Sequence, residues 1–189
     1  MSLSYKLRRY NSQTDLPDIY RVYSDYKEQY KLFSLMSLNS YEIFVSQFER
    51  KLSANYKDFL IVEVDDNFAG FIVSYDYKQN DGHIKVLVYF EKKYRSGFVG
   101  LAGIEFGDIL FQYYNIRKIY TEVYSYNTES IKYHEKIGFK EECRLKEYRY
   151  YDGVYWDVIY FCLTREDFYS NNQRFIDRFN IRPSKDLAR

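Results

Sequence analysis

A strand, a basic loop, a helix and a second strand follow one another between residues 83 and 124, and this order constrains the fold most. HIKVLVYF (83–90) alternates like a strand, residues 98–114 show the helical spacing of apolar side chains, and KIYTEVY (118–124) is again strand-like. Two strands of one sheet that a helix connects run parallel. We therefore expect one parallel strand pair at this point.

The other segments predict a sheet that is otherwise antiparallel. Strands are expected at 5–11, 59–64, 69–77 and on both sides of Asp152-Gly153, and helices at 14–26, 40–52 and 127–140. This order predicts one α/β (α+β) domain over residues 1–165, followed by a polar C-terminal extension, 166–189. If no bulge shifts the register of the last hairpin, Cys143 and Cys162 face each other as reduced neighbours.

Charge and hydropathy exclude several classes of partner. The 28 basic and 27 acidic side chains are interspersed and form no basic stripe, so no nucleic-acid partner is expected. No apolar run approaches the roughly 20 residues that cross a bilayer, and MSLSYKLRRYN lacks the apolar segment of a signal peptide. We expect a cytoplasmic protein with no membrane partner. Two cysteines and two distant histidines provide no ligand cluster, so no metal is expected.

Two segments carry candidate chemistry. KKYRSGFVG (92–100) places basic residues and glycines before a helix, where unpaired amides with partial positive charge can bind a diphosphate. In NTESIKYHEKIGFK (127–140), Asn127 is a good N-cap and Gly138 a good C-terminal stop, so His134 falls on the inward face. Taken singly, each feature is more often structural: such loops precede many helices, and an inward histidine is usually a core residue.

Together these segments resemble the GNAT superfamily of acyl-CoA-dependent N-acyltransferases, over about residues 5–165. The family's loop pattern is roughly Gln/Arg-x-x-Gly-x-Gly/Ala, and its later helix motif is matched at seven positions: Asn127, Ser130, Ile131, Glu135, Lys136, Gly138 and Phe139. The last hairpin looks most like the ribosomal-protein N-terminal and polyamine acetyltransferase branches. Two positions depart from the family: Phe98 replaces the first loop glycine, and His134, beside Tyr133, replaces the usual tyrosine.

The resemblance implies a mostly antiparallel mixed sheet with a central splayed parallel pair, helices on both faces, and acetyl-CoA as co-substrate. The strand that ends at Phe90 would pair with the pantetheine arm, and amides near Tyr89 and Phe90 would polarise the thioester carbonyl. Asn127 and Ser130 would hold the arm. The diphosphate would lie on the loop residues Arg95, Ser96, Gly97, Phe98, Val99 and Gly100.

The implied activity is that of an acetyl-CoA-dependent N-acetyltransferase in which a primary amine attacks the thioester directly. The amine could belong to a peptide or protein N-terminus, a polyamine or an aminoglycoside-like molecule. His134 is the preferred proton donor to the departing thiolate, with Tyr133 as the alternative. Glu122 and Asp76 are the candidate general bases.

Two questions stay open at this stage. The competing hypothesis is a non-catalytic GNAT-like domain that binds acyl-CoA, or has lost it, and acts as an interaction module. Titration with acetyl-CoA would separate this hypothesis from the enzyme. The aromatic tail after residue 165 could also dock on a second copy of the chain, which leaves a homodimer open.

Overall fold

The computed structural model describes residues 5–32, 40–95 and 99–188. Within these ranges, seven strands form a single sheet in the order β1-β2-β3-β4-β5-β7-β6, in which only β4 and β5 run parallel. The strands are β1 Tyr5–Arg9, β2 Tyr56–Val64, β3 Asn67–Lys78, β4 His83–Phe90, β5 Lys118–Tyr124, β6 Lys140–Tyr151 and β7 Val154–Thr164. The predicted mixed sheet with one parallel pair is therefore confirmed.

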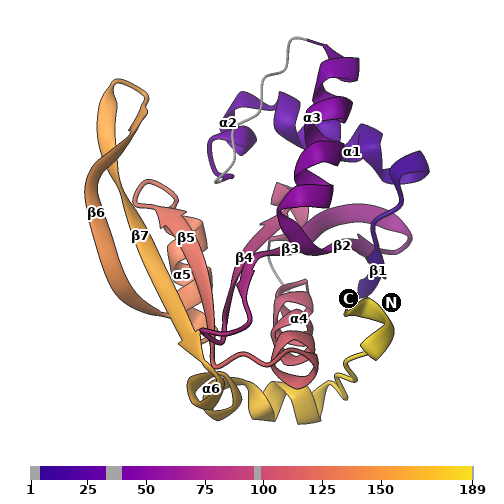
Figure 1. Cartoon of the computed structure of the whole chain (residues 1–189), viewed down its shortest axis with the longest axis vertical. Helices are drawn as coiled ribbons and strands as arrows, with labels where there is room; N and C mark the ends of the chain where they lie inside the picture. Colours follow the sequence, from indigo (N-terminus) through magenta and orange to yellow (C-terminus); the bar gives the residue numbers. More distant parts are fainter. Residues whose placement is uncertain (1–4, 33–39, 96–98, 189) are drawn as a thin grey trace.

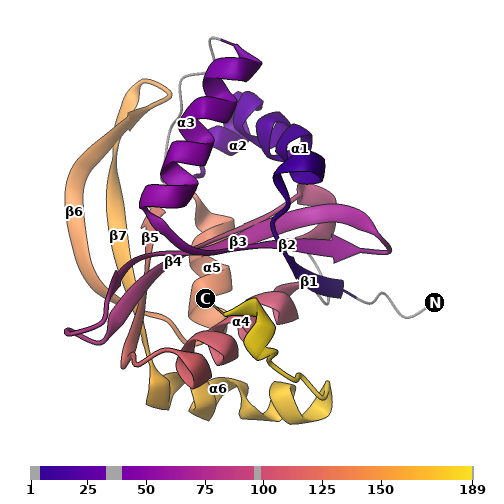
Figure 2. The same ribbon diagram turned by 45° about the vertical axis from the view of Figure 1, so that its right-hand side comes forward.

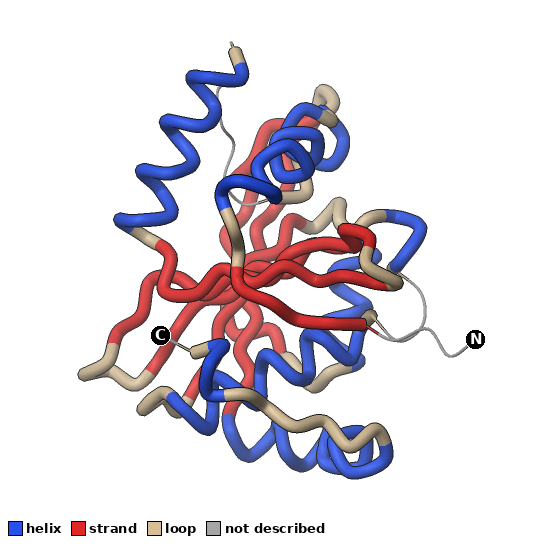
Figure 3. The backbone as a smooth tube through the Cα atoms, turned by 90° about the vertical axis from the view of Figure 1, so that its right-hand side faces the viewer, coloured by secondary structure: helices blue, strands red, loops and turns tan. Residues whose placement is uncertain are grey.

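Helices cover both faces of the sheet, as expected (Figures 1 and 3). One face carries α1 Ser12–Ser24, α2 Tyr26–Gln29 and α3 Tyr41–Ala54, and the other carries α4 Gly100–Tyr113, α5 Thr128–Lys136 and α6 Arg165–Arg178. Two short 3-10 helices are η1 Lys92–Tyr94 and η2 Lys185–Leu187. Two cores result because strand residues alternate between faces: Leu60 and Val62 pack toward α4, and Phe59 and Ile61 toward α3.

The parallel pair is joined at one end only. β4 and β5 pair at His83↔Lys118, Ile84↔Ile119 and Lys85↔Tyr120, and no pairing continues beyond these residues. β4 stays bound to β3 up to Phe90, and β5 stays bound to β7 up to Tyr124. Because each strand is fixed by its outer neighbour, the two strands diverge as a wedge. The splay that the family resemblance implies is confirmed.

The C-terminal residues form an ordered layer on this domain. In α6, the buried Phe168 packs against Gly107 of α4, and Asn172 Nδ2 donates to the carbonyl of Ile137 at 2.9 Å. The chain then crosses α4 toward β1, where Arg9 donates to the carbonyl of Asp186 at 2.6 Å (Figure 2). The tail thus packs on its own chain. The division at residue 165 and the association of two copies both stay predictions.

The expected cysteine pair is wrong. The turn at Asp152-Gly153 has positive φ at both residues, as a two-residue hairpin requires, and Tyr150 faces Tyr155. Bulges then shift the register twice, between Leu145 and Arg149 and between Glu141 and Cys143. As a result, Cys143 is exposed and faces Tyr160, while the buried Cys162 faces Lys140.

Candidate active site

A cavity of about 410 Å³ lies in the wedge between β4 and β5. Eight of the residues that the sequence singles out line it: Tyr89, Phe90, Arg95, Glu122, Asn127, Ser130, Tyr133 and His134. Val99 and Gly100 lie next to it, at the start of α4. The expected contacts of Ser96, Gly97 and Phe98 fall outside the described residues. Asp76 lines a different cavity, beside α3.

The start of α4 differs from that of the other long helices. Side chains cap α1, α3, α5 and α6: Asn11, Ser40, Asn127 and Thr164 each accept from a first-turn amide. The N-cap of α4 is Val99, whose side chain has no acceptor, so no capping side chain is present at this helix start among the described residues. Amides at a helix N-terminus carry partial positive charge, and they suit the diphosphate of a CoA thioester.

Arg95 connects three elements at the mouth of the wedge. Its Nε donates to the carbonyl of Phe90 at 2.8 Å, and its guanidinium pairs with Glu129 of α5 at 3.1 Å and with Glu28 of α2. Lys92 and Lys132 line the same cavity and add positive charge. A bound phosphate would therefore meet a cationic rim, but it would compete with two carboxylates for Arg95.

Tyr133 occupies the inner wall of the wedge. Its hydroxyl donates to the carbonyl of Gly100 at 3.3 Å, and it fits there only because Gly103 has no side chain: a Cβ at Gly103 would lie 2.1 Å from the hydroxyl oxygen. Burial raises the pKa of Tyr133 above its ordinary value, so the phenol keeps its proton at neutral pH.

His134 is 3% exposed and sits against the ring of Phe139. Its Nδ1 lies 2.7 Å from the carbonyl oxygen of Ser130, a contact that places the single proton of the neutral ring on Nδ1. Nε2 is buried without a partner among the described residues. Burial lowers the pKa of His134 to about 4. At neutral pH, Nε2 of His134 therefore carries no proton and can only accept a hydrogen bond.

Glu122 is the carboxylate inside the wedge. Its side chain is 2% exposed, and it accepts from Lys85 Nζ at 2.6 Å and from the Tyr75 hydroxyl at 3.5 Å. Burial, and then the negative charge of Glu122, raises the pKa of Tyr160 to about 12. Asp76 instead pairs with Lys78 at 2.8 Å, and this hydrogen bond holds its pKa below the ordinary value.

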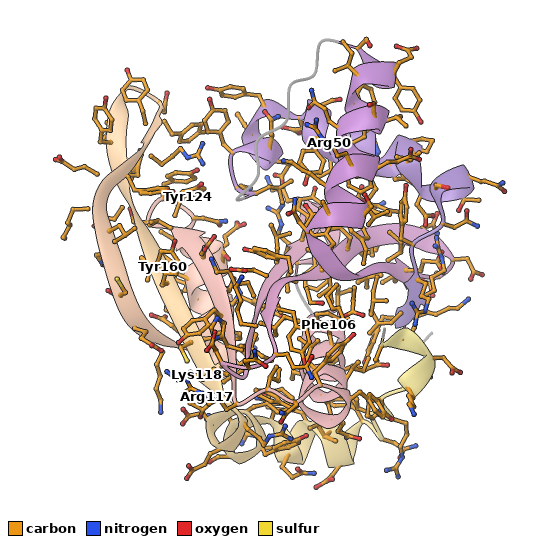
Figure 4. The ribbon with its side chains drawn as sticks, in the orientation of Figure 1. Arg50, Phe106, Arg117, Lys118, Tyr124 and Tyr160 are labelled. Carbon is orange, nitrogen blue, oxygen red and sulfur yellow. The ribbon has the colours of Figure 1, made fainter. Side chains whose placement is uncertain are left out.

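Figure 4 shows Tyr160 on β7 and Tyr124 at the end of β5, across from helices α1 to α3. Phe106 of α4 belongs to the core on the other face of the sheet. Lys85 lies over the Tyr160 ring at 5.6 Å, so this side of the wedge combines aromatic rings with an ion pair. Strand alternation could have identified Lys85, because it shares a face with Leu87 and Tyr89. No sequence pattern places Lys31 and Leu32, which follow α2 and line the cavity.

Two kinds of feature are missing from the described part of the chain. There is no group of three or more histidine, cysteine, aspartate or glutamate side chains that could hold a metal ion. None of the helices in residues 5–32, 40–95 and 99–188 combines the length and apolar character that a membrane span requires.

A wedge between diverging parallel strands, beside the start of a helix, is the arrangement expected for acyltransferases that use CoA thioesters. The family model of the acetyltransferase (GNAT) domain matches residues 9–160, and the chain belongs to this family. It is an acetyl-CoA-dependent N-acetyltransferase, with acetyl-CoA as its co-substrate.

Relatives agree with this assignment. An uncharacterised N-acetyltransferase of Bacillus subtilis (strain 168), the SPbeta prophage-derived YokL, is 34% identical over 125 residues, which are 66% of this chain and 71% of the relative. The structure of the Vibrio cholerae spermidine N-acetyltransferase in complex with CoA and spermine gives a TM-score of 0.76 at 19% identity, covering 87% of this chain and 97% of that one. A dodecameric structure of the spermidine N-acetyltransferase from the same organism gives a TM-score of 0.72 at 20% identity, covering 87% and 95%. At these identities the likeness shows the fold.

Proposed function

We propose that the chain transfers the acetyl group of acetyl-CoA to a primary amine by direct attack of the amine on the thioester. The observation that carries this proposal is the wedge itself. It brings a strand edge that does not pair with β5 and one buried carboxylate, Glu122, to a cavity of about 410 Å³, next to the start of α4.

The co-substrate is expected to bind through the backbone. The edge of β4 from Val86 to Phe90 faces the wedge without pairing to β5, so the amide groups of the pantetheine arm can pair with it like an added strand. Amides near Tyr89 and Phe90 polarise the thioester carbonyl. Asn127 and Ser130, at the start of α5, hold the arm from the other side. These two residues are already connected, because Asn127 Oδ1 accepts from the Ser130 amide at 3.3 Å.

The diphosphate is expected at the start of α4. The amides after Val99 and the guanidinium of Arg95 provide its binding groups. The family resemblance adds the loop residues Ser96, Gly97 and Phe98 to the proposed diphosphate site. The phosphates then take the place of Glu28 and Glu129 on Arg95.

The chemistry needs one proton removed and one supplied. The amine nitrogen forms a bond to the carbonyl carbon, the carbon–sulfur bond breaks, and the nitrogen passes a proton to Glu122 directly or through water. The ion pair with Lys85, at 2.6 Å, fixes the orientation of the Glu122 carboxylate. The thiolate takes a proton and leaves as CoA.

We assign the donation of that proton to Tyr133. Of the two neighbouring candidates, Tyr133 retains its proton at neutral pH, and its hydroxyl hydrogen can rotate from the carbonyl of Gly100 toward the thiolate. His134 is neutral and holds its single proton on Nδ1, against the carbonyl of Ser130, with none on Nε2. The sequence favours His134 as the donor, and its burial as a neutral ring is the physical reason why we assign the role to Tyr133 instead. Nε2 of His134, which has no partner among the described residues, is available to accept a hydrogen bond from the bound co-substrate.

The acceptor is best identified with a panel of amines. Spermidine and spermine lead the panel, because a neighbouring structure contains CoA and spermine. Peptides with free N-termini and an aminoglycoside complete it. The purified protein, with the exposed Cys143 changed to Ser so that it does not consume the thiol reagent, is assayed for CoA release. We expect one equivalent of thiol per acetylated amine with at least one member. CoA binding without release for any amine in the panel would contradict the proposal.

A further inference from the structure

A second cavity, of about 480 Å³, lies between α4, α5 and α6. It shares Phe90, Arg95 and Tyr133 with the wedge cavity, so the two meet at the start of α4. A ligand that lies along the wedge and places its diphosphate at the start of α4 would continue into this second cavity. The two cavities therefore adjoin at these three residues.

The outer wall of this cavity comes from the C-terminal residues, beyond the 9–160 range that matches the family. Phe175 is half-buried and Phe179, just after α6, is 37% exposed. The wall is fixed in place, because Asn172 bonds the carbonyl of Ile137 at 2.9 Å and Phe168 packs against Gly107. The two phenylalanines therefore belong to a defined surface.

The chemistry of this wall suits a nucleotide. The Arg174 guanidinium lies 4.8 Å from the ring centre of Phe175, and that of Arg178 lies 5.4 Å from the ring centre of Phe179. Lys136, on the α5 side, is exposed at the rim. Aromatic rings stack on any nucleobase, and cationic side chains bind phosphate groups. An adenine base with a phosphate monoester on its ribose combines both features.

We propose that this cavity binds the adenosine 3′-phosphate end of acetyl-CoA. Phe175 and Phe179 contact the base, and Lys136 binds the 3′-phosphate. The proposal rests on the proposed function, because it takes the diphosphate to lie at the start of α4. It makes the C-terminal residues of this chain a part of the co-substrate site.

Calorimetry with two probes tests this inference. CoA carries the adenosine 3′-phosphate end, and 4′-phosphopantetheine lacks it. Phe179→Ala should weaken CoA binding about tenfold, the scale of one lost base–aromatic stack, and leave 4′-phosphopantetheine binding unchanged. Phe179→Trp should restore CoA affinity. Tyr113→Ala is the matched control, because Tyr113 is also 37% exposed and lies outside the cavity, and it should change neither affinity.

A second variant tests the contact with the 3′-phosphate and leaves Phe175 and Phe179 unchanged. Wild type should bind CoA several-fold more tightly than dephospho-CoA, and Lys136→Gln should abolish that preference. Unchanged CoA affinity in Phe179→Ala, or an equal loss for CoA and 4′-phosphopantetheine, would overturn the inference. If Phe179→Ala fails to fold, an unchanged preference for CoA in Lys136→Gln overturns it. Wild type that binds no CoA would instead contradict the proposed function.

Discussion

The two sides of the wedge present different groups. The side that we propose for the co-substrate presents backbone groups: the edge of β4 that does not pair with β5, and the amides at the start of α4. The side that we propose for the acceptor presents side chains from four strands, in which Glu122 of β5 meets Lys85 of β4, Tyr75 of β3 and Tyr160 of β7. Backbone sites tolerate side-chain changes, whereas a side-chain network depends on each of its members.

This difference explains how the chain departs from the family pattern at His134 and keeps its wedge. The carbonyl of Ser130 satisfies Nδ1 of His134, and the divergence of β4 and β5 does not depend on that ring. On the side proposed for the acceptor, by contrast, the geometry depends on each side chain of the network around Glu122. We therefore expect substitutions there to change turnover without changing CoA affinity, and substitutions around Arg95 to do the reverse.

Glu122→Gln provides the largest expected effect. Loss of the general base should lower kcat by about 10³-fold, within the usual range for acid–base groups, and leave the dissociation constant of CoA unchanged. Steady-state kinetics with the accepted amine and calorimetry with CoA measure the two quantities. Asp76→Asn is the control, because Asp76 also contacts Lys85, at 3.6 Å, but lies outside the wedge cavity. Equal losses in both variants would place the base elsewhere.

His134 should make the fold sensitive to acid. Its folded pKa of about 4 lies below the unfolded value near 6.5, so the unfolded state takes up the proton first as the pH falls. This contribution to stability is complete above about pH 6.5 and declines by about 3 kcal/mol toward pH 4. Denaturant unfolding of wild type and His134→Phe between pH 7 and pH 4 measures it. Parallel stability curves for the two proteins would show that His134 is not buried as a neutral ring.

Tyr133→Phe should lower kcat by about 10²-fold, because the departing thiolate loses its donor. His134→Phe should retain more activity than Tyr133→Phe and should leave the pH dependence of kcat between 6 and 8 unchanged. Pre-steady-state measurement of thiol release checks both variants, with melting temperatures to confirm that each is folded. A larger loss in His134→Phe than in Tyr133→Phe would return the acid role to the histidine.

The smallest expected effect concerns the carboxylates on Arg95. Glu28→Gln removes the less exposed of its two acidic partners, whose side chains are 15% and 65% exposed. CoA affinity should rise two- to fivefold, about the free energy of one such ion pair, and Glu129→Gln should have a smaller effect. Calorimetry at low salt measures the change. Weaker CoA binding in Glu28→Gln would show that this glutamate supports the site.

The sequence predicts the parallel strand pair and the helix α5 well, because both follow from local order. Strand, loop, helix and strand between residues 83 and 124 imply a parallel pair, and Asn127 begins its helix as a cap should. The same helical spacing places His134 inward. It does not predict the protonation state, which depends on burial against Phe139 and on the carbonyl of Ser130, and the tertiary structure supplies both.

The acceptor side could be predicted only in part. Glu122 is identifiable on its strand, but its partners lie 37 and 47 positions away, and only the sheet order brings them together. Bulges in the last hairpin shift its register, which no spacing rule foresees, and they separate Cys143 from Cys162. The C-terminal residues gave no motif, yet α6 packs on α4 and walls a cavity.

We propose above all that the wedge between β4 and β5 binds the thioester arm of acetyl-CoA through backbone amides. Amide hydrogen exchange with and without saturating CoA measures this binding at the backbone itself. We expect increased protection at Val86 to Phe90 and at Gly100 to Ala102, with little change in β6. Protection that appears elsewhere while exchange in these two segments stays the same would contradict it.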